Sequence, residues 1–79
     1  MASTSLTLDI LRADVAEELY LDPGEISDDD NLLQAGLDSV RLLSLVDRWR
    51  RLGAHADFAD LAERPTISAW WNLLRGTDA

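Results

Sequence analysis

The segment Gly36–Ser39 reads Gly-Leu-Asp-Ser and places a serine hydroxyl where it could take part in chemistry. Gly36 gives the backbone freedom just before a strongly periodic segment that begins at Ser39. Either Asp38 or Ser39 can cap a helix there, because a short side-chain oxygen accepts a hydrogen bond from a free N–H of the first turn. The Ser39 hydroxyl would then lie at the positive end of the helix dipole, where a phosphate ester is favoured.

The residue types around Ser39 do not indicate a catalytic site. The chain has no lysine, and its one histidine, His55, has no partner with which to form a triad or a metal site. There is no glycine-rich phosphate loop, and the run Asp28–Asp30 indicates a solvated loop, because consecutive carboxylates rarely converge on one metal ion. We therefore expect no enzymatic activity and no metal, and we interpret Ser39 as the substrate of another enzyme.

Length and composition predict one small domain. The 79 residues are 47% hydrophobic, which is enough for a single compact core spanning residues 1–79, with flexible tails at 1–5 and 75–79. The absence of cysteine excludes disulfides and thiolate metal sites. A formal net charge of −8 argues against nucleic-acid binding and favours partners with positive surfaces, although simple solubility would also explain it.

Targeting signals are not evident in the sequence. No apolar run approaches the length of a membrane span, and the first five residues do not resemble a signal peptide. We therefore expect no membrane association, and a cytoplasmic location is compatible with the sequence.

Hydrophobic periodicity predicts two long helices joined by a long connection. The first covers residues 6–20, with Leu8, Leu11 and Val15 near one face and a cap from Ser5 or Thr7. The second covers 39–52 and ends at Gly53; its core stripe consists of Leu42, Leu45, Val46, Trp49 and Leu52. The connection, residues 22–36, is expected to be anchored by Ile26, Leu32 and Leu33.

Two shorter helices are predicted after Gly53. Asp57 can cap a short helix over residues 58–63, and Thr66 can cap a last helix after Pro65. The last helix carries an apolar stripe at i, i+3, i+4 and i+7 spacing, formed by Ile67, Trp70, Trp71 and Leu74. Adjacent tryptophans point about 100° apart on a helix, so we expect both to be mostly core but not both to be fully buried.

Four apolar residues are candidates for a partner-binding surface. Leu43 lies one turn after Ser39, and Val40 points away from the core stripe. Single exposed apolar residues are also common without a function. Phe58 and Ala62, four residues apart on the short helix, can extend the same surface, and Phe58 can equally well be plain core.

These motifs together resemble the acyl, peptidyl and aryl carrier proteins. Gly36–Ser39 is similar to their G-x-D-S signature, and Asp30–Leu32 to their D-N-L element. Three further segments resemble the aryl carrier branch: Arg48–Arg50, Asp57–Phe58, and Arg64–Ile67 with Trp70–Trp71. The resemblance covers roughly residues 8–74.

The resemblance implies an all-α fold, a small four-helix bundle of three main helices and a short third helix, with a long loop between the first two. It also implies that Ser39 carries 4′-phosphopantetheine, with Asp38 read by the modifying enzyme or acting as a cap. The implied partners are a phosphopantetheinyl transferase, an aryl-acid adenylating enzyme, and a condensation domain or acyltransferase. A monomer is expected.

Three functions stay open at this point. The first is a carrier of an aryl acid such as salicylate or 2,3-dihydroxybenzoate in siderophore or nonribosomal peptide synthesis. The second is a peptidyl or acyl carrier with another cargo. The third, from a different class, is a helical adaptor in which Ser39 is unmodified.

Overall fold

The fold is an all-helical bundle, as the sequence predicts. The computed structural model describes residues 6–75, and these contain no strand. Four α-helices and one short 3-10 helix follow in the order α1 (Leu8–Leu19), η1 (Pro23–Glu25), α2 (Ser39–Arg51), α3 (Phe58–Glu63) and α4 (Ile67–Arg75). Arg75, which was expected in the tail, is the last residue of α4, and the other expected tail residues, 1–5 and 76–79, lie outside the described part.

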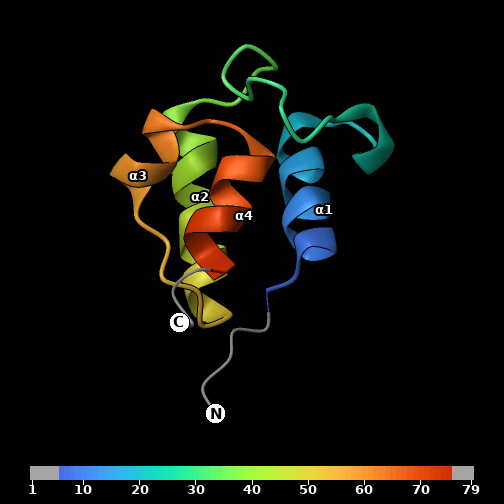
Figure 1. Cartoon of the computed structure of the whole chain (residues 1–79). Helices are drawn as coiled ribbons and strands as arrows, with labels where there is room; N and C mark the ends of the chain where they lie inside the picture. The colour runs from blue at the N-terminus through green and yellow to red at the C-terminus, as the bar shows by residue number, and fades with distance from the viewer. Residues whose placement is uncertain (1–5, 76–79) are drawn as a thin grey trace.

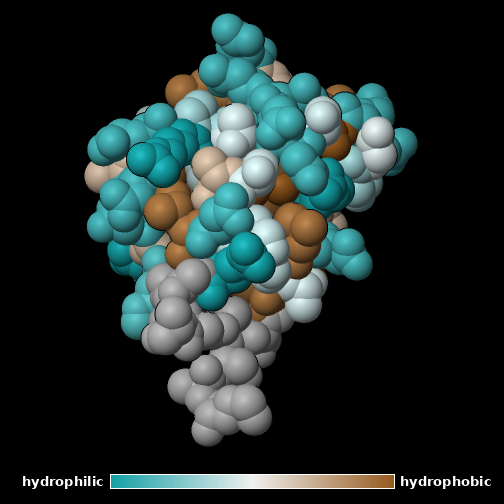
Figure 2. All heavy atoms as spheres, viewed as in Figure 1, coloured by the Kyte–Doolittle hydropathy of each residue, from teal (hydrophilic) through white to brown (hydrophobic). Residues whose placement is uncertain are grey.

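The helices α1, α2 and α4 stand side by side, and the short helix α3 lies on the far side of α2 and α4 from α1. Figure 1 shows α4 in front of α2, α1 on one side of this pair and α3 on the other. The long connection between α1 and α2 crosses one end of the bundle, and α2 begins at that end. The face seen in Figure 2 is largely hydrophilic, with small separate apolar patches. Among residues 6–75, no helix is long and apolar enough to cross a membrane.

Two tryptophans from different helices meet at the centre of the core. Trp49 of α2 and Trp70 of α4 are both fully buried, and their rings pack edge to face with centroids 5.8 Å apart. Such a pair contributes about 0.5–1.5 kcal/mol beyond the area that it buries. Trp71 is only half-buried, so the expectation that the two adjacent tryptophans would not both be fully buried is confirmed.

The helix starts follow the capping residues of the sequence. Thr7 caps α1, Asp38 caps α2, Asp57 caps α3, and Thr66 accepts a hydrogen bond from Ala69 in α4. Each such cap contributes about 1 kcal/mol. The alternative in which Ser39 caps α2 is therefore wrong, because Asp38 occupies that position and leaves Ser39 as the first helical residue. Ser5, the other candidate for the cap of α1, lies outside the described residues.

Two of the three predicted anchors of the long connection are correct. Ile26 and Leu32 are buried in the core, whereas Leu33 is 47% exposed. The reason is a tight turn, in which the Asn31 side chain accepts hydrogen bonds from the backbone N–H groups of Leu33 and Gln34. Such local side-chain bonds direct the backbone more strongly than one apolar side chain does.

The connection is also bonded to α1 and to the residues around the start of α4. Arg12 of α1 donates to the Ile26 carbonyl at 3.3 Å and pairs with Asp28 at 2.5 Å. The N–H of Leu32 donates to the Pro65 carbonyl at 2.8 Å, and that of Ser68 to the Asp28 carbonyl at 3.0 Å. These bonds give the connection a defined path between α1 and α2 without regular secondary structure.

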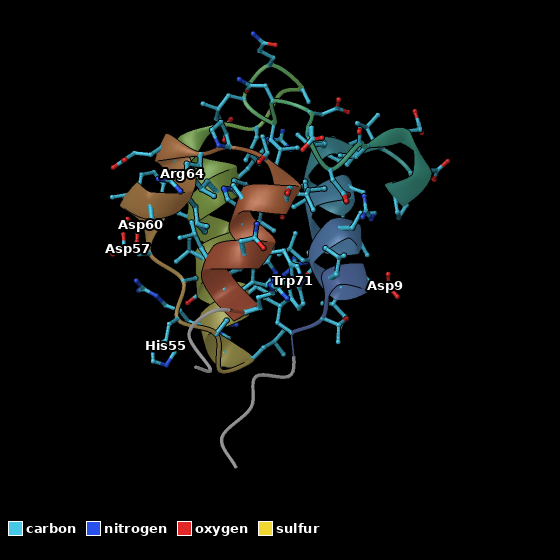
Figure 3. The ribbon with its side chains drawn as sticks, in the orientation of Figure 1. Asp9, His55, Asp57, Asp60, Arg64 and Trp71 are labelled. Atoms are coloured by element: carbon cyan, nitrogen blue, oxygen red, sulfur yellow. The ribbon has the colours of Figure 1, made fainter. Side chains whose placement is uncertain are left out.

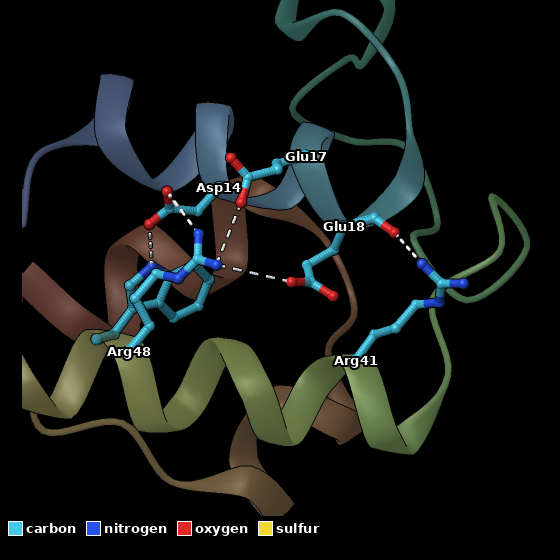
Figure 4. A network of polar contacts seen from close by, with 6 residues as sticks. Asp14, Glu17, Glu18, Arg41 and Arg48 are labelled. Carbon is cyan, nitrogen blue, oxygen red and sulfur yellow. Dashed lines mark hydrogen bonds and ion pairs between the residues drawn. The ribbon is translucent and has the colours of Figure 1, made fainter.

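A polar cross-link joins α1 to α2 (Figure 4). The Trp49 indole N–H donates to Asp14 at 3.0 Å, and Arg48 pairs with Asp14 at 3.1 Å and with Glu17 at 3.2 Å. Partial burial alone would lower the pKa of Arg48, but the hydrogen bonds and charges of Asp14 and Glu17 raise that pKa above its usual value. Because the pKa of Arg48 is raised in the folded chain, its ion pairs stabilise the fold at every pH below the ordinary arginine pKa. This stabilisation is lost only as the pH rises above that value, so Arg48 is charged at neutral pH.

The burial of Trp49 predicts a large loss of stability on truncation. Trp49→Ala should lower the free energy of unfolding by about 3–5 kcal/mol, because it leaves a cavity and removes the donor to Asp14. Urea denaturation followed by circular dichroism measures this value. A loss well below that range would contradict the central position of the indole.

Candidate functional site

Ser39 lies where the long connection turns into α2. It is exposed and is the first residue of the helix. Asp38 just before it is extended, with φ −120° and ψ 178°, and its Oδ1 accepts a hydrogen bond from the Arg41 N–H at 2.9 Å. Because Asp38 acts as the cap, the Ser39 hydroxyl is left free of that role and faces solvent at the helix tip.

The backbone before Ser39 is held in one conformation by two features. Gly36 has a φ of +118°, which L-residues rarely adopt, so the turn into α2 requires glycine. Leu37 is buried, and its N–H donates to the Leu32 carbonyl at 3.0 Å. The chain is therefore anchored two residues before Ser39, and the serine emerges from a fixed point at the bundle end.

The exposure of the residues beside Ser39 matches the sequence prediction. Val40 is 74% exposed and Leu43 is 54% exposed, while the core stripe of α2 is buried at Leu42, Leu45, Val46 and Trp49. Leu52, predicted as the end of that stripe, is only half-buried because it is the C-cap and lies past the last helical residue.

The short helix α3 packs beside α2 and supplies the other predicted surface residues. Phe58 and Ala62 are half-buried and pack against the core, so each contributes to packing and also leaves part of its surface exposed. We call Val40, Leu43, Phe58 and Ala62 the α2–α3 surface. Its role in binding partners stays a prediction.

Arg41 connects the start of α2 to the end of α1, a feature that sequence reasoning missed. Its guanidinium donates to the Glu18 carbonyl (Figure 4). It also lies 5.1 Å from the centroid of the Tyr20 ring. Its Nε lies 3.8 Å from the Asp38 carboxylate. A cation at a helix C-terminus is favourable, and so is one over an aromatic face. The only sequence signal was an arginine two residues after Ser39, which does not identify its partners.

The described residues offer no metal-binding cluster beside Ser39. They hold no cluster of three or more His, Cys, Asp or Glu side chains that could bind a metal ion. His55 is exposed in the link between α2 and α3, near the end of the bundle away from the start of α2 (Figure 3). The arrangement presents a hydroxyl to an incoming molecule, and the adjacent Asp38 carboxylate accepts a hydrogen bond from the Arg41 N–H as the helix cap.

Comparison with known proteins identifies the family. Residues 9–74 match the family model described as "Phosphopantetheine attachment site". The chain is 51% identical over 69 residues to "Acyl carrier protein ScoB" of Streptomyces coeruleorubidus, which covers 87% of this chain and 81% of that protein. It is also 50% identical over 68 residues to an "Isochorismatase" of Bacillus subtilis, covering 86% of this chain but only 22% of the relative. A third relative is "Enterobactin synthase component B" of Escherichia coli, 57% identical over 47 residues, which is 60% of this chain and 16% of the relative.

The chain therefore belongs to the phosphopantetheine-binding family of carrier proteins. Proteins of this family bind 4′-phosphopantetheine covalently on a serine. The geometry fits such a group, because an exposed hydroxyl at a helix tip leaves room for a long arm and places its phosphodiester at the positive end of the dipole.

The positive φ of Gly36 predicts a stability difference between two glycines. Gly36→Ala should lower the free energy of unfolding by about 1–3 kcal/mol, because alanine is strained at that φ although its Cβ would meet only Leu19 at 3.8 Å. Gly24→Ala is the matched control, since a Cβ there meets nothing within 4 Å. Equal effects of the two changes in urea denaturation would show that the turn before Ser39 does not require glycine.

Proposed function

We propose that this chain is an aryl carrier protein in which Ser39 bears the 4′-phosphopantetheine arm. The observation that supports this most directly is the exposed hydroxyl of Ser39 at the start of α2, in a chain that belongs to the carrier family. When attached, the arm supplies a terminal thiol that holds the acid as a thioester. The chain itself has no cysteine, so the reactive sulfur must come from the arm.

The residues around Ser39 set the electrostatic environment of the attachment point. The free N–H groups and the dipole at the start of α2 favour the arm's phosphodiester, whereas the carboxylate of Asp38, 62% exposed, opposes it. Arg41 lies 3.8 Å from that carboxylate and offsets part of its charge. Asp38 caps α2 and so fixes the position of Ser39, and its exposed carboxylate is also available for recognition by the transferase.

The aryl cargo is supported by the segments that resemble the aryl branch and by the relatives. Besides enterobactin synthase component B, the chain is 46% identical over 74 residues to "Phenyloxazoline synthase MbtB" of Mycobacterium tuberculosis, which is 94% of this chain and 5% of that relative. Within those segments, Arg48, Trp49 and Trp70 make internal contacts and lie in or beside the core. The residues that resemble the aryl branch therefore contribute to packing inside this domain and not to a binding site for the acid. We assign the choice of the acid to the adenylating enzyme.

Charge and size indicate how the partners bind. The proposed partners are a phosphopantetheinyl transferase, an aryl-acid adenylating enzyme, and a condensation domain or acyltransferase. A net charge of −8 favours partner faces with positive potential and accelerates encounter. The α2–α3 surface is small, so these complexes are transient, as a carrier that must pass between enzymes requires. The bonds are made and broken by the partners, and the carrier acts as their substrate.

A peptidyl or acyl carrier with another cargo is the second candidate. It is favoured by the identity to acyl carrier protein ScoB, whose length the chain covers to 81%. Loading assays with salicylate, 2,3-dihydroxybenzoate and amino acids, each with its own ligase, separate the two candidates. Acceptance of an amino acid but of neither aryl acid would favour the second.

The attachment of the arm is tested by intact mass. Incubation with coenzyme A, magnesium and a broad-specificity phosphopantetheinyl transferase should add one phosphopantetheine to the chain. Ser39→Ala should stay unmodified and equally stable, because Ser39 is exposed and Asp38 provides the cap. An unmodified wild-type chain would support the helical adaptor instead.

The α2–α3 surface is tested by reversing the character of one exposed residue. Leu43→Asp should reduce transfer to at least one partner about tenfold or more, while the free energy of unfolding changes by only about 0.5 kcal/mol. Ile10→Asp is the matched control, because Ile10 is an exposed apolar residue in the first turn of α1. That helix begins at the end of the bundle away from the start of α2 (Figure 1). If Leu43→Asp unfolds the chain, or if Ile10→Asp impairs transfer equally, the surface is wrongly assigned.

A further inference from the structure

The short helix α3 cannot hold its own position. It has six residues, Phe58–Glu63, far fewer than an isolated helix needs for stability in water. Its own sequence supplies an N-cap, Asp57, and one buried side chain, Leu61. The orientation of Phe58 and Ala62 therefore depends on contacts made to α3 by other helices.

Side chains from two other helices bond to the two ends of α3. Before its start, the Nε of Arg50 in α2 donates to the Ala56 carbonyl at 2.7 Å. In its last turn, the buried indole N–H of Trp70 in α4 donates to the Leu61 carbonyl at 2.8 Å. The last four carbonyl groups of a helix have no partner within it, and Leu61 contributes one of them. Both bonds are thus made to backbone groups that α3 cannot satisfy itself.

Arg50 reaches α3 from the functional side of α2. It follows Ser39 by 11 residues (50 − 39), which at about 100° per residue brings it to almost the same face of the helix. Leu43 lies on that face as well, one turn after Ser39. Ala56, the residue whose carbonyl Arg50 binds, is buried, so the guanidinium fixes a point where α3 joins the core.

We propose that Arg50 and Trp70 are positioning residues that hold α3 in the orientation in which Phe58 and Ala62 meet a partner. They set the affinity of the carrier for those partners that bind α3. This inference rests on the proposed function, because it requires a partner that reads the α2–α3 surface.

Hydrogen exchange of the isolated chain tests the structural half of the proposal. Arg50→Met keeps an unbranched side chain and removes the donor to Ala56, so the amides of α3 should exchange about tenfold faster while those of α1 are unchanged. Arg51→Met is the matched control, because it changes the charge equally and Arg51 pairs with Asp47 within α2 at 2.7 Å. Equal protection of α3 in the two variants overturns the proposal.

A second variant tests the other end of α3. Trp70→Phe keeps an aromatic ring in the core and removes the N–H that binds the Leu61 carbonyl. It should increase exchange most strongly in the last turn of α3, whereas Arg50→Met acts most strongly at its start. A uniform increase over the whole bundle in both variants would show general destabilisation and overturn the assignment.

Kinetics with a partner test the functional half. For each partner enzyme whose KM is raised by Phe58→Ala, Arg50→Met should raise KM roughly threefold to tenfold and leave kcat unchanged. The double variant should be no worse than Phe58→Ala alone, because both changes act through the same contact. Arg51→Met should leave KM unchanged. The proposal is overturned if the effects of Arg50→Met and Phe58→Ala on KM multiply in the double variant. It is also overturned if Phe58→Ala raises the KM of no partner enzyme.

Modification of Ser39 separates this inference from the proposed function. If the wild-type chain gains no phosphopantetheine, the proposed carrier function is wrong. If the chain is modified normally, but Arg50→Met changes neither the hydrogen exchange of α3 nor the KM of a partner, only the positioning role is wrong.

Discussion

The structure depends on the contacts of the Trp49 side chain at the centre of the bundle. Its ring packs edge to face on Trp70 of α4, and its N–H donates to Asp14 of α1, so one side chain of α2 connects three helices. A buried indole needs a partner for its polar N–H, and here that partner is a carboxylate which also pairs with Arg48. This arrangement makes α2 the central element of a domain with few residues available for a core.

Helix α2 has two roles, because one of its faces packs in the core and the rest of its surface is exposed. One face places Leu42, Leu45, Val46 and Trp49 in the core, and the rest of the helix surface leaves Val40 and Leu43 exposed beside Ser39. The first residue of a helix that is rigidly packed along its length is a fixed point from which a long arm can move. The carrier function therefore places rigidity in the bundle and mobility in the attached group.

The remaining segments are positioned by bonds from distant residues. The connection before Ser39 is tied to the segment around Pro65 and to Arg12, and α3 is tied to α2 and α4 through Arg50 and Trp70. These segments are too short or too irregular to be stable alone, so the long helices determine where the residues of the α2–α3 surface lie.

The sequence by itself predicted the helices, narrowed each cap to one or two residues and singled out Ser39 as the candidate site. The periodicity of α2, the candidate capping residues and the segment Gly36–Ser39 are local patterns, because their physical causes operate within one or two turns. The structure then chose Asp38 over Ser39 as the cap of α2. Only the tertiary structure decided that Leu33 faces outward, that Trp70 lies deeper than Trp71, and which groups Arg41, Arg48 and Arg50 bind. Long side chains reach partners that are near in space and far along the chain, and no spacing rule along the sequence specifies such partners.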